Sequence, residues 1–250
     1  MSRPLFIYFI KKNWAIWAGF TAYILFELVV CIFMMEQIAE MLPEGFMGIQ
    51  VNGESTLLFI GSLIPTVGCL FAMPFYILIS YRTVYRPIDT TSINTHLSSG
   101  MKRTTYLTTA ALFLAFSLFM MFFAIFLICG LSMLIWGAFN WGIWTSLLFN
   151  SLLVNLTVAF ISFFFAAAFT PGNIGKLGMI GLPILLLLLF MLSDYIPFLQ
   201  YLTPFGWLDF DKLVLGTLKL WWLWDMLYIA ITGTMVTLGI ILFKKKQLSI

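Results

Sequence analysis

Residue types that usually carry catalysis are scarce in this chain. His96 is the only histidine, so a histidine-based zinc cluster cannot form, and neither HExxH nor GxSxG occurs. The nearest approach to a phosphate-binding loop is Gly172-Asn-Ile-Gly175-Lys176, which lacks the four-residue spacer and the Ser or Thr after the lysine. We therefore expect no catalytic site, no metal site and no cofactor in this chain. Any ATP-driven work would need a separate subunit.

Charged side chains inside apolar segments are the next candidates, because they are costly in a membrane and usually functional. Glu27 is the only acidic residue well inside a predicted span. Two interpretations of it stay open: a carboxylate that contacts cargo or carries a proton, and a hydrogen bond that helps helices pack. Asp225, at the start of the last predicted span, is interpreted as interfacial.

The composition places these residues in a membrane protein. Of 250 residues, 62% are hydrophobic and 9% are charged, and the mean hydropathy is +1.04, whereas soluble domains carry roughly 25% charged residues. No polar stretch approaches the length of a separate soluble domain, which is at least about 50 residues. The sequence therefore predicts one all-α integral membrane domain over residues 1–250.

Six apolar segments reach a length that can cross a bilayer, which needs about 20 helical residues. The predicted spans are 14–35, 56–81, 105–135, 145–169, 177–193 and 223–243. Residues 36–55, 136–144 and 194–222 form the predicted external loops. The last of these is moderately apolar and broken by prolines, so we expect short re-entrant helices that dip into the outer leaflet before the final span.

The positive charges predict the orientation of these spans. Most Lys and Arg residues fall in segments that can share one side of the membrane, namely Arg3, Lys11, Lys12, Arg82, Arg86, Lys102, Arg103, Lys176, Lys244, Lys245 and Lys246. Short loops rich in Lys and Arg stay in the cytoplasm. Both termini and the segment 82–104 are therefore expected on the cytoplasmic side. The net charge of +3 is interpreted as a signal of topology and of contact with lipid head groups, not of nucleic-acid binding.

The segment 82–104 is the largest predicted cytoplasmic surface. Asp89, followed by two threonines, can cap a short helix. Ile93 and Leu97 would then share one face, and Gly100 is a suitable residue for ending the helix. We expect a helix of about two turns that lies parallel to the membrane, with basic residues at both ends.

Three further motifs resemble a known family. Residues 97–107 (LSSGMKRTTYL) lead from the polar segment into the third span, residues 41–46 (MLPEGF) contain a Leu-Pro-Glu element, and residues 201–209 (YLTPFGWLD) contain a Thr-Pro-Phe element. Residues 243–248 (FKKKQL) add a basic run after the last predicted span. In order and in topology, these features resemble the membrane subunits of ABC-2-type exporters.

The resemblance implies a coupling helix that docks onto an ATPase subunit. The positions that correspond to it are Asp89, Thr91, Ile93, His96, Leu97, Ser98, Gly100 and Arg103, and the external re-entrant element corresponds to Pro204, Phe205, Trp207 and Asp209. Coupling helices of the family often carry an acidic residue where this chain has Asn94 and His96. The resemblance also implies two ATPase subunits, which hold ATP and Mg²⁺, and a second permease copy or a related permease.

The expected function is export of an amphipathic cargo, such as an antimicrobial peptide, a drug or a lipid-like molecule, across a bacterial cell membrane. Two alternatives stay open. One is a membrane immunity or accessory protein that sequesters an antimicrobial without transporting it. The other is a secondary transporter, for which Glu27 would be the essential carboxylate.

Overall fold

The computed structural model describes residues 2–41, 68, 70–98, 100–135, 141–193, 195–214, 218 and 221–246. Every regular element among these residues is helical. The long helices are α1 (Arg3–Met41), a helix over residues 70–80, α5 (Arg103–Ile135), α6 (Trp141–Phe169), α7 (Asn173–Leu192) and α9 (Trp221–Lys245). The short elements are η2 (Tyr81–Tyr85), α3 (Arg86–Asp89), α4 (Ile93–Ser98), η3 (Pro197–Leu202), η4 (Pro204–Gly206) and α8 (Phe210–Val214).

Five of the helices are long and apolar enough to cross a membrane. They comprise Arg3–Val30 of α1, Arg103–Ile128 of α5, and the whole of α6, α7 and α9. In a bilayer core, backbone groups must bond within their own segment, which explains why apolar stretches of this length fold as helices. These five confirm that the chain is an all-α membrane protein.

The predicted spans correspond to these helices, with differences at their ends. The basic lead before residue 14 is not a separate segment, because α1 is continuous from Arg3. Of the predicted second span 56–81, residues 56–67 and 69 lie outside the described residues, and residues 70–81 are helical. The predicted loop 36–55 begins too early, because residues 36–41 are helical and extend α1 to Met41; from position 42 onward it lies outside the described residues.

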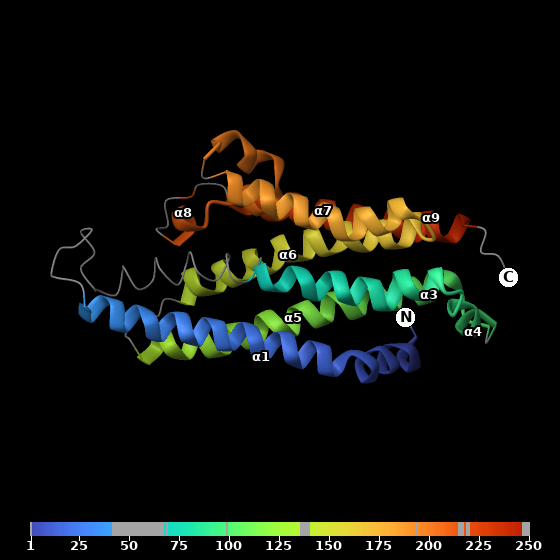
Figure 1. The fold of residues 1–250 in the computed structure, drawn as a ribbon, viewed down its shortest axis with the longest axis horizontal. Coiled ribbons are helices and arrows are strands. Elements are labelled where there is room, and N and C mark those ends of the chain that lie inside the picture. The colour runs from blue at the N-terminus through green and yellow to red at the C-terminus, as the bar shows by residue number, and fades with distance from the viewer. Residues whose placement is uncertain are drawn as a thin grey trace.

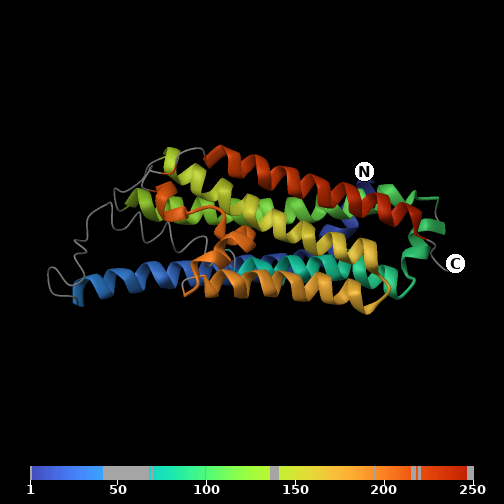
Figure 2. The same cartoon turned by 90° about the horizontal axis from the view of Figure 1, so that it is seen from above.

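The bundle is elongated, and α6 is its central helix (Figure 1). On one side α6 packs against α7 and α9, on the other against α5, and α5 in turn packs against α1. Viewed from above, α9 and α6 run side by side along most of their length (Figure 2). The long axis of the bundle is therefore the direction in which the chain would cross a membrane.

One boundary prediction is wrong and bears on the candidate site. The polar segment was expected to begin at Arg82, but the helix over residues 70–80 continues through the π-helix η2 and through α3 to Asp89. The reason is that Arg82 and Arg86 are good helix formers, and a helix can extend beyond the apolar layer once its charged residues reach water. The segment that departs from the bundle therefore begins at Thr90.

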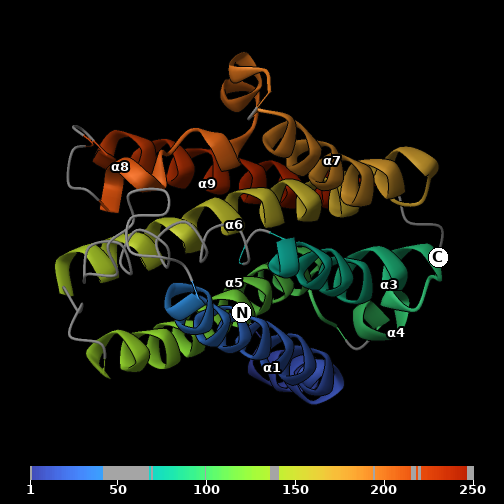
Figure 3. The ribbon, with the colours of Figure 1, turned by 60° about the vertical axis from the view of Figure 1, so that its left-hand side comes forward.

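Short helices also form in the segment before α9, as the proline-rich sequence predicts. Pro197 and Pro204 begin the 3₁₀-helices η3 and η4, where their missing N–H groups leave no donor unpaired. Figure 3 shows this segment as a projection beside the end of α7. The expectation that these helices enter the outer leaflet stays a prediction.

Candidate functional site

The short helix α4 lies at one end of the bundle, the end that also holds the N-terminal residues and the end of α9 (Figure 1). The chain reaches it through a turn in which Thr91 has a left-handed φ of 56°, and leaves it at Gly100, where φ is 83°. The Gly100 N–H donates to the carbonyl of Leu97 at 3.1 Å. Gly100 therefore ends the helix as predicted, in a conformation that glycine adopts without strain.

The predicted helix start is wrong. Asp89 is the last residue of α3 and does not cap α4, and its side chain is exposed. The first turn of α4 is instead connected through backbone bonds from Asn94 to Thr91 and from Thr95 to Ser92. The Thr95 hydroxyl also donates to the Ser92 carbonyl at 2.7 Å. Because the preceding helix extends to Asp89, that residue is too far from α4 to cap it.

The inner face of α4 is attached to two long helices. Ile93 is 1% exposed and belongs to the core, and Leu97 packs against that core. The His96 ring contacts Tyr8 of α1 and Tyr106 of α5, with ring centroids 5.7 and 5.8 Å apart. Ile93, His96 and Leu97 therefore hold α4 against the bundle, so a charged substitution at Ile93 would disturb folding and not docking alone.

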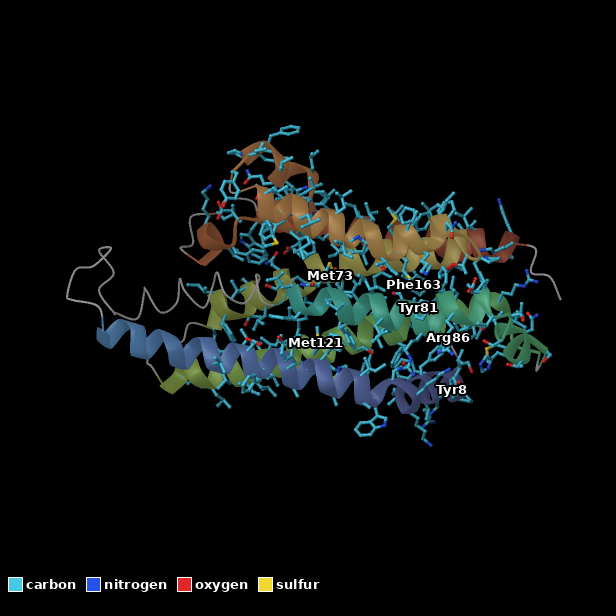
Figure 4. All side chains as sticks on the ribbon, viewed as in Figure 1. Tyr8, Met73, Tyr81, Arg86, Met121 and Phe163 are labelled. Carbon is cyan, nitrogen blue, oxygen red and sulfur yellow. The ribbon has the colours of Figure 1, made fainter. Side chains whose placement is uncertain are left out.

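The tyrosines that hold His96 are themselves fixed. The Tyr106 hydroxyl donates to the carbonyl of Thr83 in η2 at 2.9 Å, in a buried position. Lys12 donates to the Tyr8 hydroxyl at 3.1 Å and lies 5.3 Å from the centre of that ring. Figure 4 shows Tyr8 and Arg86 at the same end of the bundle as α4. Both tyrosines connect α4 to helices that run the length of the molecule, and no local sequence pattern marks either of them as part of the site.

The outer face of α4 and of its flanking turns is polar and exposed. It consists of Asp89, Thr90, Thr91, Ser92, Thr95, Ser98, Gly100 and Lys102. We call this set the α4 outer face. Of the predicted coupling residues, Asp89, Thr91, Ser98 and Gly100 lie on it.

Arg103 has a different environment. It is half-buried, and its guanidinium donates to the backbone carbonyl of Lys246, just after α9. The Lys246 ammonium donates to the carbonyls of Ala167 and Ala168 near the end of α6, at 3.4 and 3.3 Å. A cation at this position also interacts favourably with the helix dipole, although partial burial lowers the pKa of Lys246. Arg103 therefore connects the start of α5 to α9.

Glu27 lies away from this region, in the span of α1. It is half-buried, and the polar group that interacts with its carboxylate is the side chain of Tyr23, one turn earlier on the same helix. Because this partner lies on the same helix, it does not join Glu27 to a second helix, and both interpretations of Glu27 stay predictions.

The residues of the external element pack against α7 and α9. Phe205 is 1% exposed and contacts Phe190, with ring centroids 6.1 Å apart. Trp207 stacks on Tyr228 at 5.7 Å, and the Tyr228 hydroxyl donates to the carbonyl of Pro204 at 2.7 Å. This element is therefore fixed to the bundle by aromatic contacts and one buried hydrogen bond.

Asp209 has a local role in the same element. It accepts a hydrogen bond from the backbone N–H of Lys212 at 3.0 Å, and its carboxylate pairs with the Lys212 ammonium at 2.9 Å. This contact raises the pKa of Lys212. Both side chains are largely exposed, so the pair contributes little to stability. Asp209 therefore caps the N-terminus of α8.

The chain matches no protein-family model, and no significant match is found among curated proteins or solved structures. The functional assignment therefore depends on the chain's own residues and geometry.

Proposed function

We propose that this chain is the membrane subunit of an exporter that is driven by a separate ATPase, and that α4 is the helix that docks onto that ATPase. One observation carries the proposal: α4 combines a buried inner face with an exposed polar outer face at the end of the bundle. A surface that transmits force must be rigidly attached on one side and accessible on the other. Ile93 and His96 supply the attachment, and the α4 outer face supplies the accessible side.

The contacts around α4 also provide routes into the membrane region. A displacement of α4 would press on α1 and α5 through the rings of Tyr8 and Tyr106. The hydrogen bond from Arg103 to the carbonyl of Lys246 would transmit the same displacement to α9. In the complete transporter, two such subunits would stand over two ATPase subunits, which bind ATP and Mg²⁺. The two membrane subunits would enclose a path for an amphipathic cargo.

The test is purification of the chain from its native membrane in mild detergent. We expect an ATPase to purify with it in comparable amounts, together with ATP hydrolysis that depends on the complex. Thr95→Trp places a large ring on the α4 outer face and should abolish co-purification, whereas Thr95→Ser keeps the hydroxyl and should retain it. Thr95 is exposed, and its hydrogen bond to the Ser92 carbonyl lies at the surface. Thr95→Ser should therefore unfold at the same temperature as the unaltered protein, and Thr95→Trp within a few degrees of it.

Two results would overturn the proposal. One is a phenotype conferred by the chain in cells that lack any partner ATPase, which would favour an immunity protein. The other is a complex that survives Thr95→Trp, since α4 would then not be the docking helix.

A further inference from the structure

The contact between α6 and α9 keeps one register over at least two helical turns. Thr157 Oγ1 lies 3.1 Å from Thr232 Oγ1. Further along, a Cβ on Gly239 would lie 3.7 Å from Phe164 Cα. In both pairs the α9 residue follows the α6 residue by 75 positions, and the two pairs are seven residues apart. Seven residues make about two turns, so helices that run in the same direction repeat their contacts at this interval.

The same spacing can be applied toward the beginning of both helices. Seven residues before Thr157 is Asn150, and seven residues before Thr232 is Asp225, so these two residues form the next pair. Both side chains are buried, with exposed fractions of 0% and 7%. The buried residues of α9 are Asp225, Tyr228, Gly239 and Phe243, which form one stripe along the helix. Gly239 and Tyr228 of this stripe contact α6 directly. Asp225 therefore faces α6 at the level of Asn150.

The hydrogen bonding of these two residues leaves a pair of acceptors. The Asn150 side-chain amide nitrogen donates to the carbonyl of Ser146 at 2.8 Å. Its Oδ1 and the Oδ1 of Asp225 are both buried and have no hydrogen-bond partner among the described residues. Two buried acceptor oxygens at one level of neighbouring helices repel each other, unless one of them carries a proton or a cation lies between them.

The surroundings disfavour an ionised carboxylate at Asp225. Helix α6 contains no Asp, Glu, Lys, Arg, His or Tyr. On α9 the neighbouring titratable group is Tyr228, whose hydroxyl already donates to Pro204. Among the described residues, the one ion pair joins Lys212 to Asp209, and the charged residue of α5 is Arg103, at its opposite end. An ionised carboxylate without a cation is far more costly to bury than the neutral acid.

We propose that Asp225 and Asn150 form a proton-binding site between α6 and α9, in which protonated Asp225 donates to Asn150 Oδ1. The site takes up one proton from water and releases it when the two helices separate or when the pH rises far enough. It lies within the membrane-spanning part of α9, where Asp225 is the fifth residue of the helix. The inference goes beyond the proposed transport function and does not depend on it.

The first test follows the unfolding midpoint of the purified protein as a function of pH. An acid that is protonated when folded and ionised when unfolded loses its stabilising effect as pH rises above about 4. The reference is Asp225→Asn, whose side chain is neutral at every pH and can still donate to Asn150. As pH rises, the unaltered protein should lose stability compared with this variant. The exposed Asp89→Asn is the matched control and should keep the unaltered pH profile.

Infrared spectroscopy gives a second readout. The carboxylic-acid C=O band of the unaltered protein at neutral pH should disappear in Asp225→Asn and persist in Asp89→Asn. Parallel pH profiles for the unaltered protein and Asp225→Asn, with no infrared band lost, would overturn the proposal. A midpoint raised by Na⁺ relative to choline, in the unaltered protein but not in Asp225→Asn, would also overturn it in favour of a cation site.

The geometry has its own test. With the native cysteines replaced by serine, cysteines at positions 150 and 225 should form a disulfide on mild oxidation. Cysteines at 149 and 225 should not, because Phe149 is 46% exposed on another face of α6. Failure of the first pair to form a disulfide would remove the facing arrangement on which the site depends.

Discussion

Most polar side chains inside the apolar helices donate to a carbonyl one turn earlier on their own helix, but a few connect one helix to another. Trp17 of α1 donates to the carbonyl of Ser117 on α5 at 3.1 Å, and Ser162 of α6 donates to the carbonyl of Met179 on α7 at 2.6 Å. Such bonds matter in a membrane because there is little hydrophobic drive between helices in lipid. Individual hydroxyl and indole groups therefore specify which helices are neighbours.

Tyr106 offers a direct measurement of one such contact. Tyr106→Phe removes the buried hydrogen bond from the tyrosine hydroxyl to the Thr83 carbonyl. We expect the free energy of unfolding to fall by about 0.5–1.5 kcal/mol, measured by denaturation in detergent. Tyr195→Phe is the control: Tyr195 is 83% exposed, so its hydroxyl can be removed with little effect. Equal losses in the two variants would contradict the role given to Tyr106.

At the residue scale, the sequence predicted some positions of the candidate site and missed others. Gly100 was predictable because glycine is common after a helix end, and Ile93 because its spacing from Leu97 marks an apolar face. Tyr8, Tyr106 and Lys246 were not predictable, since their contacts join residues far apart in the chain. A local pattern carries no information on such pairs.

The helices are the scale at which the sequence was most informative. Apolar length predicted all five candidate spans, because a bilayer imposes both the length and the helical conformation. The errors lie at the ends, where charged residues were interpreted as loops. Arg3 begins α1 and Arg86 begins α3, so charge marks where a helix leaves the apolar layer rather than where it ends.

The turn between α6 and α7 gives a prediction at the scale of the element. A Cβ on Gly175 would lie 2.8 Å from Phe169 C and 2.9 Å from Phe169 O, which are backbone atoms that cannot rotate away. We expect Gly175→Ala to lower the free energy of unfolding by about 1–3 kcal/mol. This close approach also accounts for the glycine in the motif that resembles a phosphate loop.

Gly181 supplies the matched control on the same helix. A Cβ at this position meets nothing within 4 Å, and alanine favours a helix over glycine by about 1 kcal/mol. Gly181→Ala should therefore leave stability unchanged or raise it, as measured by the same denaturation. A stable Gly175→Ala variant would mean that the turn between α6 and α7 is looser than described.

On the scale of the whole molecule, the chain divides into two ends with different chemistry. One end gathers α4, the start of α1 and the end of α9, together with Arg103 and Lys246. The other end carries η3, η4 and α8, with exposed aromatic side chains such as Phe198 and Tyr201. This division agrees with the expected orientation, in which the basic end faces the cytoplasm.

Labelling from one side of the membrane tests that orientation. Single cysteines are introduced into a cysteine-free variant in place of Thr95, Phe198 or Lys244, which are all exposed. A membrane-impermeant maleimide added to intact cells should label position 198 alone, and positions 95 and 244 only after the cells are permeabilised. Labelling of position 95 in intact cells would reverse the orientation and place α4 out of reach of a cytoplasmic ATPase.

The contact of the His96 ring with two tyrosine rings has a practical consequence for spectroscopy. His96 is the only histidine in the chain, so its imidazole would give one set of resonances in a spectrum of histidine-labelled protein. Ring currents from Tyr8 and Tyr106, both within 6 Å of it, would shift those resonances strongly. Any partner or cargo that moves α4 relative to α1 or α5 would change that shift, so the protein contains a natural NMR probe beside its proposed docking surface.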